Sequence, residues 1–138
     1  ASADVVFTTS FSRRGLIGEY GIAWTLPRLV GPSLAADLLL SARRVTADEA
    51  LRIGLVSQII PVGELLGAAQ SYARDLADNV SPRSMRVIKR QIWASLGQSL
   101  GEALILAEEE MKGTFGSADF KEGMEAFLAK RPPRWQGR

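Results

Sequence analysis

Glu19 is the residue in this 138-residue sequence that is best suited to acid–base chemistry. It stands between Gly18 and Gly21, in an otherwise apolar stretch at the start of a predicted helix. Apolar surroundings favour the neutral form of a carboxyl group, whereas a helix N-terminus favours its anion. A carboxyl group tuned by its surroundings can exchange protons near neutral pH. The alternative is an ordinary exposed glutamate at a helix start, since most glutamates are exposed.

The composition restricts the other chemistry that the chain could perform. The sequence has no cysteine and no histidine, so disulfides, thiolate chemistry and histidine ligation of metals are excluded. We expect no metal site. Acid–base work therefore falls to Asp, Glu, Lys or Tyr, or to residues outside this chain.

The charge of the chain argues against a nucleic-acid partner. The formal net charge is only +2, which is weak for binding a polyanion such as DNA. Basic residues gather locally at Arg13-Arg14, at Arg43-Arg44 and in the tail after residue 129. These clusters are either solvated surface or a site for a small polyanionic ligand. No apolar run approaches the roughly 20 residues of a membrane span, and no signal peptide is recognisable, so a cytoplasmic protein is predicted.

Short elements surround Glu19. β-Branched and aromatic residues at 5–9 predict a strand, and three glycines within 12–21 predict a loop with unusual backbone angles. Apolar spacing predicts helices over residues 23–29 and 33–41.

The next segment has its own start and stop signals. Thr46 and Glu49 predict a capping box that opens a short helix, and Gly54 predicts its end. The β-rich run 55–60, which Pro61 ends, predicts a short strand.

The rest of the sequence predicts a helical array. One helix is expected over residues 64–79, and the others begin at Ser81, at a second capping box formed by Ser99 and Glu102, and at Ser117. Each carries an apolar stripe that we expect to be buried. The stripe after Ser99 consists of Leu100, Ala103, Leu104, Ala107 and Met111.

The segment from Phe11 to Gly31 resembles a pattern found in one family of enzymes. That pattern runs F-x-x-x-G-L-x-P-[DE]-x-G and then L-P-R-x-x-G, and Glu19 falls on its acidic position. Gly18 stands in place of the usual proline, and Ile22 in place of a common second glycine. In this segment the chain is similar to the crotonase (enoyl-CoA hydratase/isomerase) family. Further blocks resemble the same family in the same order: ADLLLSA at 36–42, VTADEA at 45–50, GLV at 54–56 and FKEGMEAFLAKRP at 120–132.

This resemblance implies a fold class and a division of the chain. The fold would be the C-terminal half of a ClpP/crotonase-like α/β fold, and the fragment itself would be mainly α-helical with one or two short strands. Residues 1–61 would be the C-terminal part of the crotonase core, and 62–138 a helical oligomerisation region with a basic tail. The missing N-terminal half would contain the two oxyanion-hole N–H groups and the first glutamate of true hydratases. We therefore expect little or no turnover from these 138 residues alone.

The resemblance also implies an activity and a set of site residues. The full-length enzyme would bind an acyl-CoA thioester and stabilise its enolate, with Glu19 as acid or base in enoyl-CoA hydration or isomerisation. Hydratase and isomerase are not separated by the sequence. Coenzyme A would be part of the substrate, with no additional cofactor, and the assembly a homo-trimer or hexamer. The implied substrate-binding residues are Leu16, Gly18, Trp24 and Lys130. Lys130 would lie near the CoA phosphates or be an exposed lysine, and Trp24 would line the acyl pocket or pack between helices.

Two alternatives remain at this point. The stretch 46–57 has the helix, glycine turn and apolar spacing of a DNA-binding helix-turn-helix, although a β-rich run follows it. The chain could also be a non-catalytic crotonase-like subunit or binding module.

Overall fold

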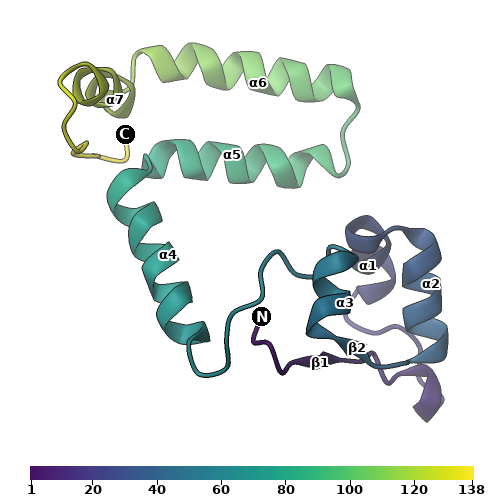
Figure 1. Ribbon diagram of the computed structural model, residues 1–138. Helices are drawn as coiled ribbons and strands as arrows, with labels where there is room; N and C mark the ends of the chain where they lie inside the picture. The colour runs from purple at the N-terminus through teal and green to yellow at the C-terminus, as the bar shows by residue number, and fades with distance from the viewer. The chain divides into compact units, whose positions relative to one another are not determined.

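The computed structural model describes all 138 residues and divides into two compact units, residues 1–69 and 70–138. The first contains β1 (Val6–Phe7), the 3₁₀ helix η1 (Ser12–Arg14), α1 (Ile22–Val30), α2 (Pro32–Ser41), β2 (Val45–Thr46) and α3 (Ala47–Arg52) (Figure 1). The second contains most of α4 (Leu65–Asn79), then α5 (Pro82–Ser95), α6 (Leu100–Phe115) and α7 (Ala118–Leu128). None of these helices combines the length and apolar content that crossing a bilayer requires.

The only sheet pairs β1 with β2. The two strands are antiparallel, with Val6 opposite Thr46 and Phe7 opposite Val45. The strand predicted at 5–9 is thus present but shorter. Its partner was not predicted, because it is only two residues long and includes Thr46, the capping residue of α3.

The strand predicted over residues 55–60 is wrong. The N–H groups of Leu55 and Val56 donate to the Ala50 carbonyl at 2.8 and 3.3 Å, so they complete the end of α3 rather than a ladder. Only Ile60 makes an isolated bridge, to Ser2. The helix-turn-helix alternative fails for the same reason, since no helix follows α3 until Leu65.

The core of the first unit consists of small and medium side chains. Its buried residues come from α1, α2, β2 and α3 and are Leu26, Ala35, Leu38, Val45 and Ala50. In Figure 1, α1 and α2 lie side by side, and they are in contact. α2 is also in contact with η1, the short helix that precedes Glu19 in the chain.

Serine caps begin the helices of the second unit as predicted. Ser81, Ser99 and Ser117 each accept a hydrogen bond from a backbone N–H in the first turn. Ser99 and Glu102 form the full reciprocal box. The first predicted box is only half formed: Thr46 accepts from the Glu49 N–H at 3.4 Å, but the Glu49 carboxylate binds elsewhere.

The predicted burial of the helical stripes is wrong for much of the second unit. Leu100 of α6 is 78% exposed and Leu104 is 55% exposed, and Met111 is exposed as well. The helices α5 and α6 lie alongside each other (Figure 1) and are in contact, and Ala103 and Ala107 of α6 are half-buried. The larger apolar side chains of the stripe nevertheless stay exposed. The periodicity therefore predicted the helix correctly but not what covers it.

Candidate functional site

The segment before Glu19 is fixed to the C-terminal end of α2. Four side chains donate hydrogen bonds of 2.9–3.1 Å to backbone carbonyls within residues 38–42. The donors are Thr8, Thr9, Ser12 and Arg13. The last carbonyls of a helix lack partners within the helix, and a cation there is favoured by the helix dipole. This set of contacts, called the α2 clamp below, gives the glycine-rich loop a fixed starting point.

A tight turn fixes the other end of the loop. The Ile22 N–H donates to the Glu19 carbonyl at 3.1 Å, across Tyr20 and Gly21. Both central residues have positive φ, 53° and 73°, as in a type I′ turn. A tyrosine at positive φ is uncommon, and here its side chain is almost fully exposed. Glu19 therefore lies immediately before α1 in a strained, well-defined turn.

The Glu19 side chain is half-buried and makes no hydrogen bond or ion pair within the chain. Exposed apolar side chains precede it in the loop, Leu16 and Ile17. A carboxyl group with no internal partner beside apolar side chains can accept a proton from a bound molecule and return it. Gly18 directly precedes Glu19 in this loop.

Gly18 is in close contact with the first turn of α1. A Cβ at position 18 would lie 3.1 Å from the Cγ2 of Ile22 and 3.5 Å from the Cβ of Ala23. The two departures from the family pattern are therefore in contact: the larger residue at 22 fills the space beside the smaller residue at 18.

Gly18→Ala tests this contact. We expect it to lower the free energy of unfolding by about 1 kcal/mol, because overpacking outweighs the entropic gain of replacing glycine. In an Ile22→Ala background the same substitution should be neutral or stabilising. Urea unfolding of all four members of the cycle in the full-length protein measures this. A Gly18→Ala effect that is independent of residue 22 would contradict the coupling.

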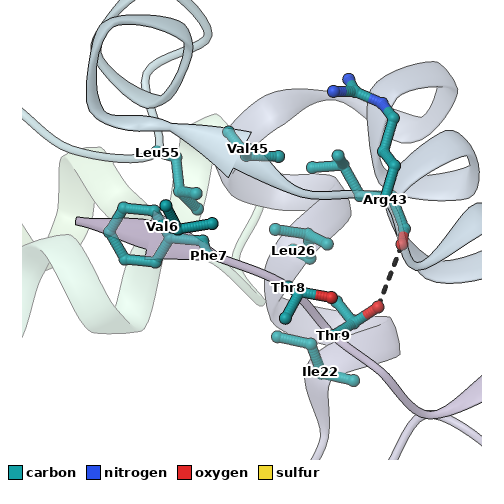
Figure 2. Close-up of a pocket in the computed structure, with 10 residues that line it drawn as sticks. Val6, Phe7, Thr8, Thr9, Ile22, Leu26, Arg43, Val45 and Leu55 are labelled. Atoms are coloured by element: carbon teal, nitrogen blue, oxygen red, sulfur yellow. Dashed lines mark hydrogen bonds between the residues drawn. The ribbon is translucent and has the colours of Figure 1, made fainter. Parts of the chain in front are cut away.

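An apolar pocket of about 360 Å³ lies between β1 and the helices α1 and α2. Figure 2 shows Val6, Phe7, Leu26 and Leu55 around it, with Ile22 at one side. The dashed line marks the α2-clamp bond from the Thr9 hydroxyl to the Leu38 carbonyl, 3.0 Å long. Neither Glu19 nor Trp24 lines this pocket.

Arg43 is engaged by two carboxylates. It donates to both oxygens of Glu49 at 2.9 and 2.8 Å and to Asp37 at 2.6 Å. The bond to Glu49 and then that to Asp37 raise the pKa of the Arg43 guanidinium above its ordinary value, and Arg43 lowers the pKa of Glu49. These pairs explain why Glu49 does not complete its capping box. Arg43 holds the β2–α3 junction and is not a free cation for a ligand.

Trp24 is exposed on α1 rather than packed between helices. The Arg28 guanidinium lies over its ring, 3.7 Å from the centroid, and donates to the Trp24 carbonyl at 2.9 Å. The structure thus brings Leu16, Gly18 and Glu19 together in one loop and places Trp24 on the following helix.

Lys130 belongs to the second unit, where it follows the end of α7. Its backbone has φ +50°, its side chain is exposed, and it makes no ion pair with any residue of the chain. The basic tail, residues 131–138, follows it. Sequence reasoning did not identify the residues that hold this tail, Asp119 and Glu122, nor the donors of the α2 clamp. Of these residues only Glu122 had a signal in the sequence, because it lies, together with Arg131, in the family-like block at 120–132.

Asp119 and Glu122 bind the tail to the first turns of α7. The Asp119 carboxylate is buried and accepts from the Ser81 hydroxyl at 2.6 Å and from the N–H groups of Gln136 and Gly137 at 2.8 and 2.9 Å. Burial alone would raise the pKa of Asp119, but these hydrogen bonds outweigh it and the pKa is lowered. Hydrogen bonds from the Arg131 side chain and then the residue 134 N–H lower the pKa of Glu122 to about 2.

Residues 1–138 match a family model described as enoyl-CoA hydratase/isomerase. A probable enoyl-CoA hydratase of Rhodobacter capsulatus is 37% identical over 139 residues, covering 100% of this chain and 53% of that protein. The 1,2-epoxyphenylacetyl-CoA isomerase of Escherichia coli is 33% identical over 138 residues, covering 100% of this chain and 52% of that protein. The chain thus spans about half the length of the curated relatives it matches.

Solved structures agree with this match. A probable enoyl-CoA hydratase/isomerase from Mycobacterium abscessus superposes with a TM-score of 0.95 and 37% identity, covering 99% of this chain and 54% of that one. An enoyl-CoA hydratase from Bacillus anthracis gives a TM-score of 0.95 and 30% identity, covering 100% of this chain and 53% of that one. These matches confirm the predicted fold class, a mainly helical piece of a crotonase-like fold with one small sheet.

Proposed function

The chain belongs to the enoyl-CoA hydratase/isomerase family, and from this membership we propose that the whole protein is an acyl-CoA-processing enzyme with Glu19 as its acid or base. The observation that carries the proposal is the Glu19 carboxylate itself. It is held in a defined turn, beside apolar side chains, without a partner inside the chain. Its place on the acidic position of the family pattern supports the assignment.

The proposed reaction moves one proton at the acyl chain of a thioester. In hydration, one O–H bond of water and the π bond between the α- and β-carbons of a trans-2-enoyl-CoA break, the water oxygen bonds to the β-carbon, and the proton released by water is balanced by a proton that bonds to the α-carbon. In isomerisation, a proton leaves one carbon and returns to another as the double bond migrates. Glu19 carries that proton in either case, and general acid–base catalysis of this kind contributes about 10²–10⁴-fold. Leu16 and Gly18 would form the substrate-side surface of the loop.

The rest of the machinery is proposed to lie in an N-terminal half of similar length. Two backbone N–H groups there would stabilise the enolate oxygen, and one such donor is typically worth about 3–4 kcal/mol. We propose that this chain is the C-terminal half. Within it, residues 1–61 would complete the crotonase core and 62–138 would form the oligomerisation region and basic tail.

A homo-trimer or hexamer is the proposed assembly. The exposed apolar face of α6 supports it, because soluble monomers seldom expose large apolar patches. Coenzyme A would enter as part of the substrate, so no separate cofactor is proposed. We propose a cytoplasmic location for the enzyme.

Turnover of crotonyl-CoA tests the proposed function. The full-length protein should hydrate it, and the 138-residue chain alone should show little or no turnover, because a carboxylate without an enolate-stabilising site leaves most of the barrier in place. Loss of the enoyl absorbance during the assay measures both. Robust hydration by the isolated chain would contradict the proposal that an N-terminal half supplies the enolate-stabilising groups. An inactive full-length protein would favour a non-catalytic subunit.

A further inference from the structure

The turn that precedes α1 carries only two side chains, those of Glu19 and Tyr20. Glycines stand on both sides of this pair, at positions 18 and 21. The Ile22 N–H closes the turn on the Glu19 carbonyl at 3.1 Å. Neighbouring Cα atoms lie about 3.8 Å apart in any chain. A carboxyl group and an aromatic ring are therefore carried next to each other by one fixed turn.

Tyrosine is an unfavourable residue for this turn. Tyr20 has φ +53° and Gly21 has φ +73°, which is the combination of a type I′ turn. Glycine, asparagine and aspartate dominate the central positions of such turns. A bulky side chain is strained in the left-handed region, and Tyr20 is the only aromatic residue of this chain with positive φ. The sequence therefore carries a ring where local stability favours a small residue.

The Tyr20 side chain gains no packing within the chain in return for this strain. Ala42 also has positive φ, but its side chain is buried and contributes to the first unit. Ser10 has positive φ as well, and its hydroxyl shares a hydrogen bond of 3.3 Å with that of Thr8. The Tyr20 side chain, in contrast, is 98% exposed. Strained residues without a structural return are concentrated at functional sites.

The loop around this ring is apolar. Leu16 and Ile17 precede the turn, and both side chains are exposed. Together with the Tyr20 ring they place apolar surface next to the proposed acid, Glu19. Removing such surface from water is favourable when the group that covers it is also apolar. The alkyl or aromatic part of an acyl group meets this requirement, whereas a charged group does not.

We propose that Tyr20 is a specificity-determining residue, whose ring contacts the acyl chain beyond the carbons on which Glu19 acts. This inference rests on the proposed function for the identity of the ligand, an acyl-CoA thioester. A crotonyl group carries only a methyl group on its β-carbon and reaches little of the ring. A longer chain gains about 0.8 kcal/mol for each methylene that it buries. Tyr20 therefore favours long acyl chains over short ones.

Tyr20→Asn in the full-length protein separates the turn from the ring, because asparagine tolerates the left-handed conformation. Its thermal midpoint should equal or exceed that of the wild type. Its affinity for decanoyl-CoA, measured by calorimetry, should fall by about 5- to 30-fold, and that for butyryl-CoA by less than about 2-fold. These saturated thioesters report binding without turnover. With trans-2-decenoyl-CoA, KM should rise by the same factor as the decanoyl-CoA affinity falls.

Tyr20→Phe keeps the ring and should match the wild type in both affinities. Tyr72→Ala is the control for loss of an exposed tyrosine, since Tyr72 lies on α4 outside the proposed site. It should also leave both affinities unchanged.

Three results would overturn the assignment of Tyr20. The first is an unchanged ratio of the two affinities in Tyr20→Asn, and the second is an equal loss in Tyr20→Phe, which would assign the effect to the hydroxyl. The third is a lower thermal midpoint in Tyr20→Asn, which would remove the strain. If the wild type binds decanoyl-CoA with the expected dependence on Tyr20 but turns over no enoyl-CoA, the proposed enzymatic function fails and the assignment stands. If it turns over both enoyl thioesters and the ratio is unchanged in Tyr20→Asn, the assignment fails and the enzymatic function stands.

Discussion

Glu19→Gln in the full-length protein is expected to lower kcat for crotonyl-CoA by about 10²–10⁴-fold, with KM nearly unchanged. Glutamine has almost the same shape but cannot accept and return a proton. The fold should tolerate the change, because the Glu19 carboxylate forms no hydrogen bond or ion pair in the structure. Steady-state kinetics together with a thermal unfolding curve therefore separate loss of chemistry from loss of structure.

Glu64→Gln is the appropriate control for this experiment. Glu64 is exposed before α4, its side chain has no partner, and it lies outside the proposed site. It should retain wild-type kcat. Unchanged turnover in Glu19→Gln would contradict the catalytic assignment and favour the non-catalytic interpretation of the chain.

Asp119→Ala should have the largest effect on stability, lowering the free energy of unfolding by about 2–4 kcal/mol. The substitution leaves the Gln136 and Gly137 N–H groups and the Ser81 hydroxyl without their buried acceptor. Each such unpaired group costs about 1–3 kcal/mol, partly recovered where water can enter. Urea unfolding measures the loss, and faster amide exchange at residues 136 and 137 should locate it in the tail.

Asp119→Asn supplies the matched comparison. Oδ1 receives both tail N–H groups and Oδ2 receives the Ser81 hydroxyl, so an asparagine amide can keep the first pair and donate to the hydroxyl oxygen. Its loss of stability should therefore be clearly smaller than that of alanine. Equal losses for the two variants would show that the hydrogen-bond geometry of Asp119 is not what holds the tail.

Local signals in the sequence predicted the helices well. Ser81, Ser99 and Ser117 mark helix starts that the structure confirms, because a cap depends only on residues within one turn. Gly54 likewise marks the end of α3. The box at Thr46 is half formed because Arg43, which lies before the helix, takes the Glu49 carboxylate. A local rule therefore failed where a competing partner was available.

Features that depend on distant residues could not be predicted. The donors of the α2 clamp lie 28 to 34 positions from their acceptors, and nothing in the local sequence pairs them. The same holds for the bond from Ser81 to Asp119 across 38 positions. Glu19 itself was found through its glycine-bracketed setting and its match to a family pattern, and its catalytic role stays a prediction. The strand predicted over residues 55–60 is wrong because β propensity does not show whether a pairing partner exists.

The α2 clamp restricts how sequences of this kind can diverge. Successive carbonyls of a helix point about 100° apart, so inserting or deleting one residue in α2 would turn all four acceptors away from their donors together. Substitutions on the outward face of α2, such as at the exposed Leu40, leave that geometry intact. The geometry of the clamp thus constrains the length of α2 more than its outer surface, and natural variants are expected to differ there by replacement rather than by insertion or deletion.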